Sequence, residues 1–216
     1  MENISFELAT GKIMVIQGKN GSGKSSLLKC IYGILTPDQG EILFEGKLVL
    51  GPLFQLIPGH RGMKWVSGEQ TLLINHTVTE NLRDKMEGWD ELYKKKKTEQ
   101  LLKMMELDAL QNEKAHILSE GQKKRLVLAL AFCDFPKLLL LDEPFSGLDP
   151  EFKKKVIAYL RLTLREQDAS CIIVTHQNEP LSGKGDAVYN LINGRIRKKR
   201  KKRKMNKAGS NFFSKT

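Results

Sequence analysis

Eight consecutive residues near the start of the chain have the types and spacing of a phosphate-binding loop. They fit the pattern G-x-x-x-x-G-K-[ST] at every fixed position and read Gly18-Lys19-Asn20-Gly21-Ser22-Gly23-Lys24-Ser25. Glycines let the backbone turn tightly, so that successive N–H groups point at the β- and γ-phosphates of a nucleotide. Lys24 adds a positive charge, and the Ser25 hydroxyl, with Ser26 beside it, is placed to ligate Mg²⁺. These residues predict a site for ATP and Mg²⁺.

The elements around this loop have to place it correctly. Residues 12–17 predict a buried strand, and residues 24–32 predict the start of a helix. A strand, a glycine loop and a helix N-terminus together make an anion site. A Gly/Ser-rich turn that matches by chance is the alternative for one short motif, so the rest of the chain has to decide.

Two adjacent acids follow a second apolar run. Residues 138–141 are four leucines, and Asp142 and Glu143 come directly after them. Such a run is typical of a fully buried parallel strand whose carboxyl end opens on a ligand crevice. One carboxylate can hold the metal through water, while the next polarises an attacking water. The pair is therefore a candidate for hydrolytic chemistry.

Two further patterns are consistent with a phosphate site. Ser119, Gly121 and Gln122 lie where a helix over 122–132 is expected to begin, which is again anion-binding chemistry. The stretch Ser146-Gly147-Leu148-Asp149 follows the acidic pair, and His176 follows an apolar strand predicted over 171–174. A histidine at a strand end can also be purely structural.

Taken in their order along the chain, the motifs resemble those of the nucleotide-binding subunit of ATP-binding cassette (ABC) transporters. The resemblance identifies 18–25 as the Walker A loop, 138–143 as the Walker B strand and 119–122 as the signature, which reads LSEGQ against the commoner LSGGQ. It also identifies 146–149 as the D-loop and His176 as the switch histidine. A lone phosphate loop also occurs in kinases and GTPases, but this set of motifs is not typical of either.

The resemblance implies a role for each residue of the catalytic half-site. Glu143 would act as general base or water orienter, and Asp142 and Ser25 would hold Mg²⁺. Lys24 would stabilise charge on the transferred phosphoryl group, and His176 would contact the γ-phosphate.

The resemblance also implies a dimer. Two cassettes would meet head to tail, so that ATP lies between Walker A of one and Ser119, Gly121 and Gln122 of the other. Asp149 would report across the interface. A chain with one motif set then has to form a homodimer or pair with a second cassette.

Two departures from the family pattern concern nucleotide contacts. The family's Q-loop glutamine, a metal ligand, falls at Gly68 by counting back from Thr77, with Gln70 two residues away as the alternative. The family also carries an aromatic residue that stacks on adenine, on strands ahead of residues 3–8. Either the true start lies earlier in the gene, or base stacking comes from elsewhere.

The coarse element pattern predicts an α/β fold, a P-loop NTPase of the ABC type with a mainly parallel sheet flanked by helices. A small antiparallel part is expected from strands over 41–44 and 47–50, and a helical subdomain over about 78–132. Thr77 and Glu80 have capping-box spacing for the first helix of that subdomain. Further strands are expected over 4–8, 63–66 and 187–191, and a helix over 151–165.

Charge divides the chain into two parts. Residues 195–216 hold 11 of the 36 Lys and Arg and none of the 25 Asp and Glu, so 25 of each remain in residues 1–194 and the net charge of +11 belongs to this tail. We therefore expect an ATPase domain over 1–194 and a disordered polybasic tail over 195–216. The tail either is a solvated extension without a specific role, or is attracted to anionic lipid headgroups, or binds nucleic acid weakly.

Composition limits the functional classes. The chain of 216 residues has 40% hydrophobic residues and no run of 18 apolar residues, so a translocation path would belong to a separate transmembrane permease subunit. The leading expectation is a transport-coupled ATPase on the cytoplasmic face of a membrane. The alternatives are a soluble ABC ATPase that acts on nucleic acid or the ribosome, and a regulatory cassette that binds ATP but scarcely hydrolyses it.

Overall fold

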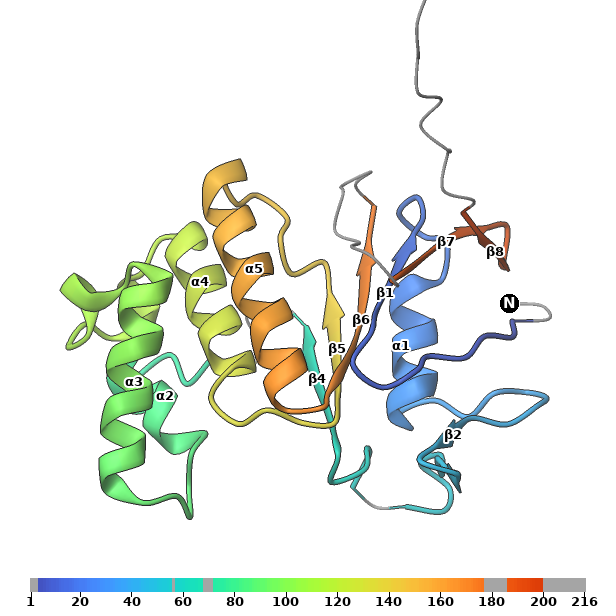
Figure 1. The fold of residues 1–216 in the computed structure, drawn as a ribbon, viewed down its shortest axis with the longest axis horizontal. Coiled ribbons are helices and arrows are strands. Elements are labelled where there is room, and N and C mark those ends of the chain that lie inside the picture. Colours follow the sequence, from blue (N-terminus) through green and yellow to red (C-terminus); the bar gives the residue numbers. More distant parts are fainter. Residues whose placement is uncertain (1–3, 56, 68–71, 177–185, 200–216) are drawn as a thin grey trace, which may run out of the picture.

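A six-stranded sheet forms the centre of the chain in a computed structural model, described here for residues 4–55, 57–67, 72–176 and 186–199 (Figure 1). The first five strands in spatial order run parallel and the last is antiparallel to its neighbour. In that order they are β4 (Met63–Ser67), β5 (Leu138–Asp142), β6 (Ser170–Thr175), β1 (Ile13–Gln17), β7 (Ala187–Ile192) and β8 (Arg195–Lys198). A separate antiparallel pair consists of β2 (Leu43–Phe44) and β3 (Lys47–Leu48). The predicted fold class is confirmed.

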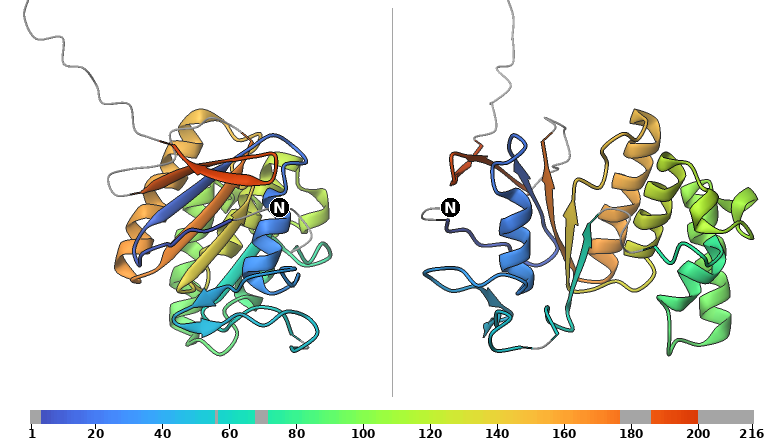
Figure 2. Two further views of the ribbon diagram at one scale, coloured as in Figure 1. Left: turned by 90° about the vertical axis from the view of Figure 1, so that its right-hand side faces the viewer. Right: turned by 180° about the vertical axis from the view of Figure 1, so that it is seen from behind.

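Helices cover the sheet on both faces (Figure 2). Helix α1 (Lys24–Tyr32) covers one face, while α4 (Glu120–Ala131) and α5 (Pro150–Glu166) cover the other. Helices α2 (Val78–Asp84) and α3 (Glu91–Met105) lie beyond α4, on the side of the molecule farthest from α1. Two short 3₁₀ turns, η2 (Asp108–Leu110) and η3 (Ala115–Ile117), connect α3 to α4. Residues 78–132 are thus mostly helical, as predicted.

The alternation of side chains along β1 explains the two layers. Met14 and Ile16 belong to the core on the α1 side, whereas Ile13 and Val15 belong to the core under α4 and α5. All five β1 residues are buried, as is expected for a strand of a parallel sheet covered on both faces.

Strand register brings three segments together that are far apart in sequence. Gln17 lies opposite Thr175, and Asp142 lies opposite Val174, so β1, β5 and β6 end at the same edge of the sheet. The Gly18 N–H donates to the Thr175 carbonyl at 3.1 Å, and the Glu143 N–H donates to the Val174 carbonyl at 3.0 Å. This edge is where the candidate catalytic residues emerge.

The strand predicted over 4–8 is wrong. The segment is described but has no regular secondary structure. Its alternating side chains Ile4, Phe6 and Leu8 nevertheless pack against the core on the α1 side. The period of two therefore reports burial of one side of the segment, which has no strand partner among the described residues.

The domain boundary predicted at 194 is also wrong, because Arg195–Lys198 form strand β8. Asn193 and Gly194 both have positive φ, 49° and 74°, and join β7 to β8 in a two-residue turn. Ile196 packs against the core, and the Lys199 N–H donates to the Val188 carbonyl at 2.7 Å. The ordered domain includes these first cations of the basic segment. The predicted Q-loop residues, Gly68 and Gln70, lie outside the described residues.

Within the described part of the chain, no helix is both long and apolar enough to cross a membrane. All three cysteines are free thiols; Cys133 and Cys171 are buried, and Cys30 is half-buried. Burial raises the pKa of the Cys133 thiol to about 11, which keeps it protonated and unreactive near neutral pH.

Candidate nucleotide-binding site

The phosphate loop connects β1 to α1 and is shaped by close backbone contacts. A Cβ at Gly18 would lie 2.7 Å from the Leu191 carbonyl oxygen, which leaves room only for glycine there. Gly23 caps α1 with φ of 97° and provides no side chain to occupy the first amides of the helix. The helix N-terminus is thus open toward the loop, with its partial positive charge available to an anion.

Lys24 is held in place by the loop that it serves. Its side chain is nearly buried, and Nζ donates to the carbonyls of Gly18 at 2.9 Å and Lys19 at 3.1 Å. The same atom lies 3.7 Å from Oε1 of Glu143. An ammonium group has three donors, so it can exchange these carbonyls for phosphate oxygens without changing its place.

Glu143 and His176 lie side by side beyond the ends of β5 and β6. Nδ1 of His176 is 3.0 Å from Oε2 of Glu143, although both carboxylate oxygens are buried and neither makes an aligned hydrogen bond. Glu143 also has φ of 49°, in the left-handed region, at a cost of roughly 1–2 kcal/mol. Strain of this kind is typical of residues held for function.

A cavity of about 350 Å³ joins the loop to Glu143. It is lined by Asn20, Gly21, Gly23, Lys24, Ser25, Ser26 and Glu143. Its volume is in the range of small-molecule sites. Ser22 has a buried hydroxyl without a hydrogen-bond partner among the described residues, but it is not one of the residues that line the cavity. The open N-terminus of α1 and the ammonium group of Lys24 suit a polyphosphate.

The donor set also fits magnesium. The Ser25 hydroxyl lines the cavity, and Asp142 is half-buried at the end of β5, next to Glu143. In proteins Mg²⁺ is usually held by one or two carboxylates together with substrate phosphates and water. One hydroxyl and one carboxylate beside a phosphate cavity match this pattern.

The signature residues are not part of this cavity. Ser119 caps α4: its Oγ accepts from the Gln122 N–H at 3.3 Å, and Oε1 of Gln122 accepts from the Ser119 N–H at 2.9 Å. Within the described part of the chain, neither Ser119, Gly121 nor Gln122 forms a hydrogen bond or ion pair with residues 18–26. The predicted site residues thus separate into a catalytic group and a signature group.

Asp149 belongs to the signature group. It caps α5, with Oδ1 accepting from the Phe152 N–H at 2.8 Å, and Oδ2 lies 3.5 Å from Nη2 of Arg125 on α4. Lys124 makes a second link to the D-loop, by donating to the Ser146 carbonyl at 3.1 Å. The sequence prediction did not assign a role to either cation, although both lie one turn into the signature helix.

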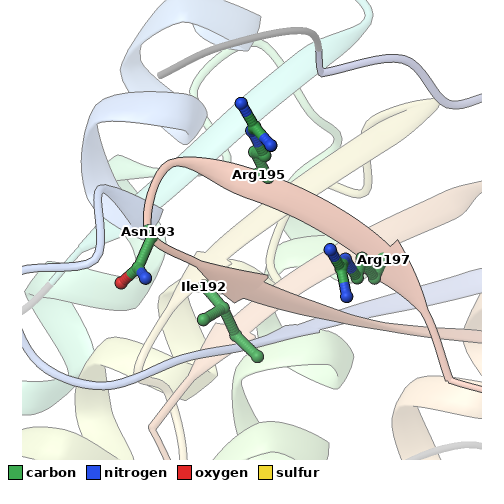
Figure 3. Close-up of a pocket in the computed structure, with 4 residues that line it drawn as sticks. All are labelled: Ile192, Asn193, Arg195 and Arg197. Carbon is green, nitrogen blue, oxygen red and sulfur yellow. The ribbon is translucent and has the colours of Figure 1, made fainter.

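A second concavity lies at the turn between β7 and β8 (Figure 3). Its volume is about 360 Å³, and it is lined by Ile192, Asn193, Arg195 and Arg197. Arg195 and Arg197 are two residues apart on one strand, so their side chains leave the same face of the sheet. The Asn-Gly turn and the alternating arginines were signals for this basic surface.

The fold and the site together define an α/β protein of the P-loop class, with a carboxylate and a histidine paired at the carboxyl ends of the central strands. A sequence profile described as "ABC transporter" matches residues 1–146. The chain belongs to the ABC transporter family of ATPases.

Relatives and solved structures agree with this assignment. The chain is 33% identical over 198 residues to the probable sulfate/thiosulfate import ATP-binding protein CysA of Chlorella vulgaris, covering 91% of this chain and 82% of the relative. It is 35% identical over 199 residues to the methionine import ATP-binding protein MetN of Rhizobium johnstonii, covering 91% of this chain but only 55% of that relative. The chain thus spans little more than half of several curated relatives that it matches.

Two solved cassettes share the fold. One is cbiO1 of Clostridium perfringens, described as part of the ABC transporter complex cbiONQ, with a TM-score of 0.72, 29% identity and coverage of 89% of this chain and 78% of that one. The other is the cassette MJ0796, solved as a dimer in a post-hydrolysis state with ADP and Pi. It has a TM-score of 0.76, 25% identity and coverage of 92% and 90%.

Proposed function

We propose that this chain binds and hydrolyses ATP to drive translocation through a separate transmembrane permease subunit. The observation that carries the proposal is the convergence of Lys24, Glu143 and His176 where β1, β5 and β6 end. Phosphoryl transfer needs charge stabilisation and a positioned water, and these three residues can supply both.

The phosphates of ATP would occupy the cavity between the loop and Glu143. The first amides of α1 and the Lys24 ammonium provide the donors for them. Ser25 and Asp142 would hold Mg²⁺, which neutralises charge that develops on the phosphates.

Glu143 is the group placed to accept a proton from an attacking water. Nζ of Lys24 and Nδ1 of His176 flank its two oxygens, at 3.7 Å and 3.0 Å. His176, with 39% of its side chain exposed, can turn toward a γ-phosphate and still contact Glu143. Glu143 and His176 together would orient the water on the side of the cavity away from the phosphate loop.

The signature group supports a head-to-tail dimer, either with a second copy or with a related cassette. A Cβ at Gly121 would meet no atom within 4 Å, and its φ is not positive, so contacts inside the described chain do not call for glycine. The Ser119 hydroxyl accepts the capping bond and keeps its own proton for a phosphate oxygen. The dimeric solved cassette supports this arrangement.

A membrane partner is supported by the printed functions of the relatives, which are import ATP-binding proteins. One exposed apolar patch suits such a partner: Leu73, Ile74 and Ile117 are 43%, 55% and 57% exposed. The backbone joins the two sides of this patch, since the His116 N–H donates to the Ile74 carbonyl at 2.9 Å. Residues on both sides of α2 would thus face one binding partner. The chain would then work at the cytoplasmic face of a membrane.

The arginines of β8 favour attraction to anionic lipid, since a basic residue near such a surface contributes about 1 kcal/mol. The same surface keeps the soluble, nucleic-acid-associated ATPase as a second candidate function, with salt-sensitive binding as its signature. Replacing Arg195 and Arg197 by glutamine removes two of the 11 cations in residues 195–216 and should weaken binding to anionic vesicles by about 2 kcal/mol. Ribosome or DNA association that survives these replacements, without recovery in membranes, would favour the second candidate.

Steady-state ATPase assays with the Glu143→Gln variant test the catalytic assignment. Loss of the general base should lower kcat by about 10²–10⁴-fold, while ATP binding persists. Gel filtration of the variant with ATP and Mg²⁺ should show a trapped dimer. Undiminished turnover would overturn the role of Glu143.

A further inference from the structure

The signature helix and the D-loop are joined by two consecutive cations. Lys124 and Arg125 lie one turn after the cap of α4, and both reach the segment that links β5 to α5. Lys124 donates to the Ser146 carbonyl at 3.1 Å, so its charge is directed at the loop backbone. The Lys124 ammonium also lies 3.2 Å from the place that a Cβ on Gly147 would take.

Arg125 contacts the far end of the same loop. Its Nη2 lies 3.5 Å from Oδ2 of Asp149, and its guanidinium lies 4.0 Å from the centroid of the Phe152 ring. The other side of the guanidinium pairs with Glu106, at the end of α3. The planar fork of arginine is suited to such divided contacts.

The D-loop is also tied to the catalytic carboxylate through its backbone. The Ser146 N–H donates to the Glu143 carbonyl at 3.3 Å, while the Ser146 carbonyl accepts from Lys124. One peptide segment therefore connects Glu143 to the helix that carries Ser119 and Gly121. A shift of α4 would be passed to the backbone of the catalytic residue.

We propose that Lys124 and Arg125 are positioning residues that fasten the D-loop to the signature helix of the same chain. These two parts of the dimer interface would then move as one unit with Glu143. This inference rests on the proposed function, because the unit would act on ATP held by a second cassette. The adjacent Lys123 provides a contrast, since among the described residues its side chain pairs with Glu120 alone, on its own helix, at 3.5 Å.

The first test is amide hydrogen exchange of residues 145–149 in the isolated chain without nucleotide. Lys124→Met should speed exchange of these amides by about tenfold, because a hydrogen bond from a charged group to the loop is lost. Lys123→Met is the matched control and should leave exchange unchanged. Equal exchange in the two variants would contradict the proposed link between Lys124 and the D-loop, whatever the ATPase activity of the chain.

The second test separates positioning from stability. Lys124→Met should lower kcat about tenfold with KM within about twofold, and should weaken ATP-driven dimerisation in the Glu143→Gln background. Lys124→Arg should restore most of both, since it keeps a donor at this place. A loss of kcat that follows a fall in Tm, or that Lys123→Met reproduces, would contradict the inference. Absence of turnover in the unmodified chain would instead contradict the proposed function. The exchange result would still show whether Lys124 holds the D-loop.

Discussion

Helices α2 and α4 begin with the same local device but do different work. At α2, Oγ1 of Thr77 accepts from the Glu80 N–H at 3.1 Å, and Glu80 accepts from the Thr77 N–H at 2.7 Å. At α4, Ser119 and Gln122 exchange the equivalent pair of bonds. Both are capping boxes, and each should contribute similarly to helix stability.

The two helices differ in the first-turn N–H groups that do not hydrogen-bond to the cap side chain. At α2 the N–H groups of Val78 and Thr79 donate to the carbonyls of Glu113 and Gln111, at 2.9 Å and 3.0 Å. At α4 the Gly121 N–H has no acceptor within the described part of the chain. The same motif is structural where the chain satisfies the next amides and available for a ligand where it does not.

An acidic residue at position 121 should have the largest effect on this contrast. Gly121→Asp places a negative charge where a phosphate of the partner's nucleotide would approach, so turnover should fall by about 10²-fold or more. Folding should persist, because the side chain has free space and an acid favours a helix N-terminus. ATPase assays with thermal unfolding check this. A parallel fall in Tm would show that Gly121 is required by the fold.

Removing each cap hydroxyl gives a smaller and more discriminating effect. Thr77→Ala and Ser119→Ala should each lower the free energy of unfolding by about 1 kcal/mol. Only Ser119→Ala should also lower turnover, by about tenfold, because only this hydroxyl would contact phosphate. Urea unfolding and ATPase assays of both variants check the pair. Equal turnover in the two would remove the distinction between the helices.

The smallest expected difference between the two capping boxes is in their sensitivity to acid. The pKa of Glu80 is lowered, mainly by its hydrogen bond from the Thr77 backbone and then from the Thr77 side chain. Its contribution to stability is therefore present above the ordinary glutamate pKa and is lost as pH falls through the lowered value. Gln122 does not titrate. NMR of the first-turn amides during acid titration should show α2 fraying before α4, and Glu80→Gln should abolish this order.

Elements with a strong local pattern were predicted well. Helix α1 has the predicted bounds, and the box at Thr77 and Glu80 is confirmed. Glycine loops, caps and runs of leucine specify structure within a few residues, so sequence alone suffices there.

Features that depend on distant partners were not predicted. Segment 4–8 has a strand pattern but no neighbouring strand among the described residues. Strand β8 lies in what the sequence predicts to be the tail, because its high charge outweighs the single apolar residue, Ile196, that packs against the core. The left-handed backbone of Glu143 and the reach of Lys124 to Ser146 arise from the sheet and from helix placement, which no local pattern specifies.

The position of β1 in the sheet has a consequence for synthesis on the ribosome. Its neighbours β6 and β7 begin at Ser170 and Ala187, so the strand that leads into the phosphate loop emerges long before the strands that flank it. Contacts of such large sequence separation form slowly. A nascent chain therefore carries its nucleotide loop without the framework that shapes it, and ATP affinity arises only after β6 and β7 have been made. Binding of nucleotide would in this way report that the sheet around the loop has formed.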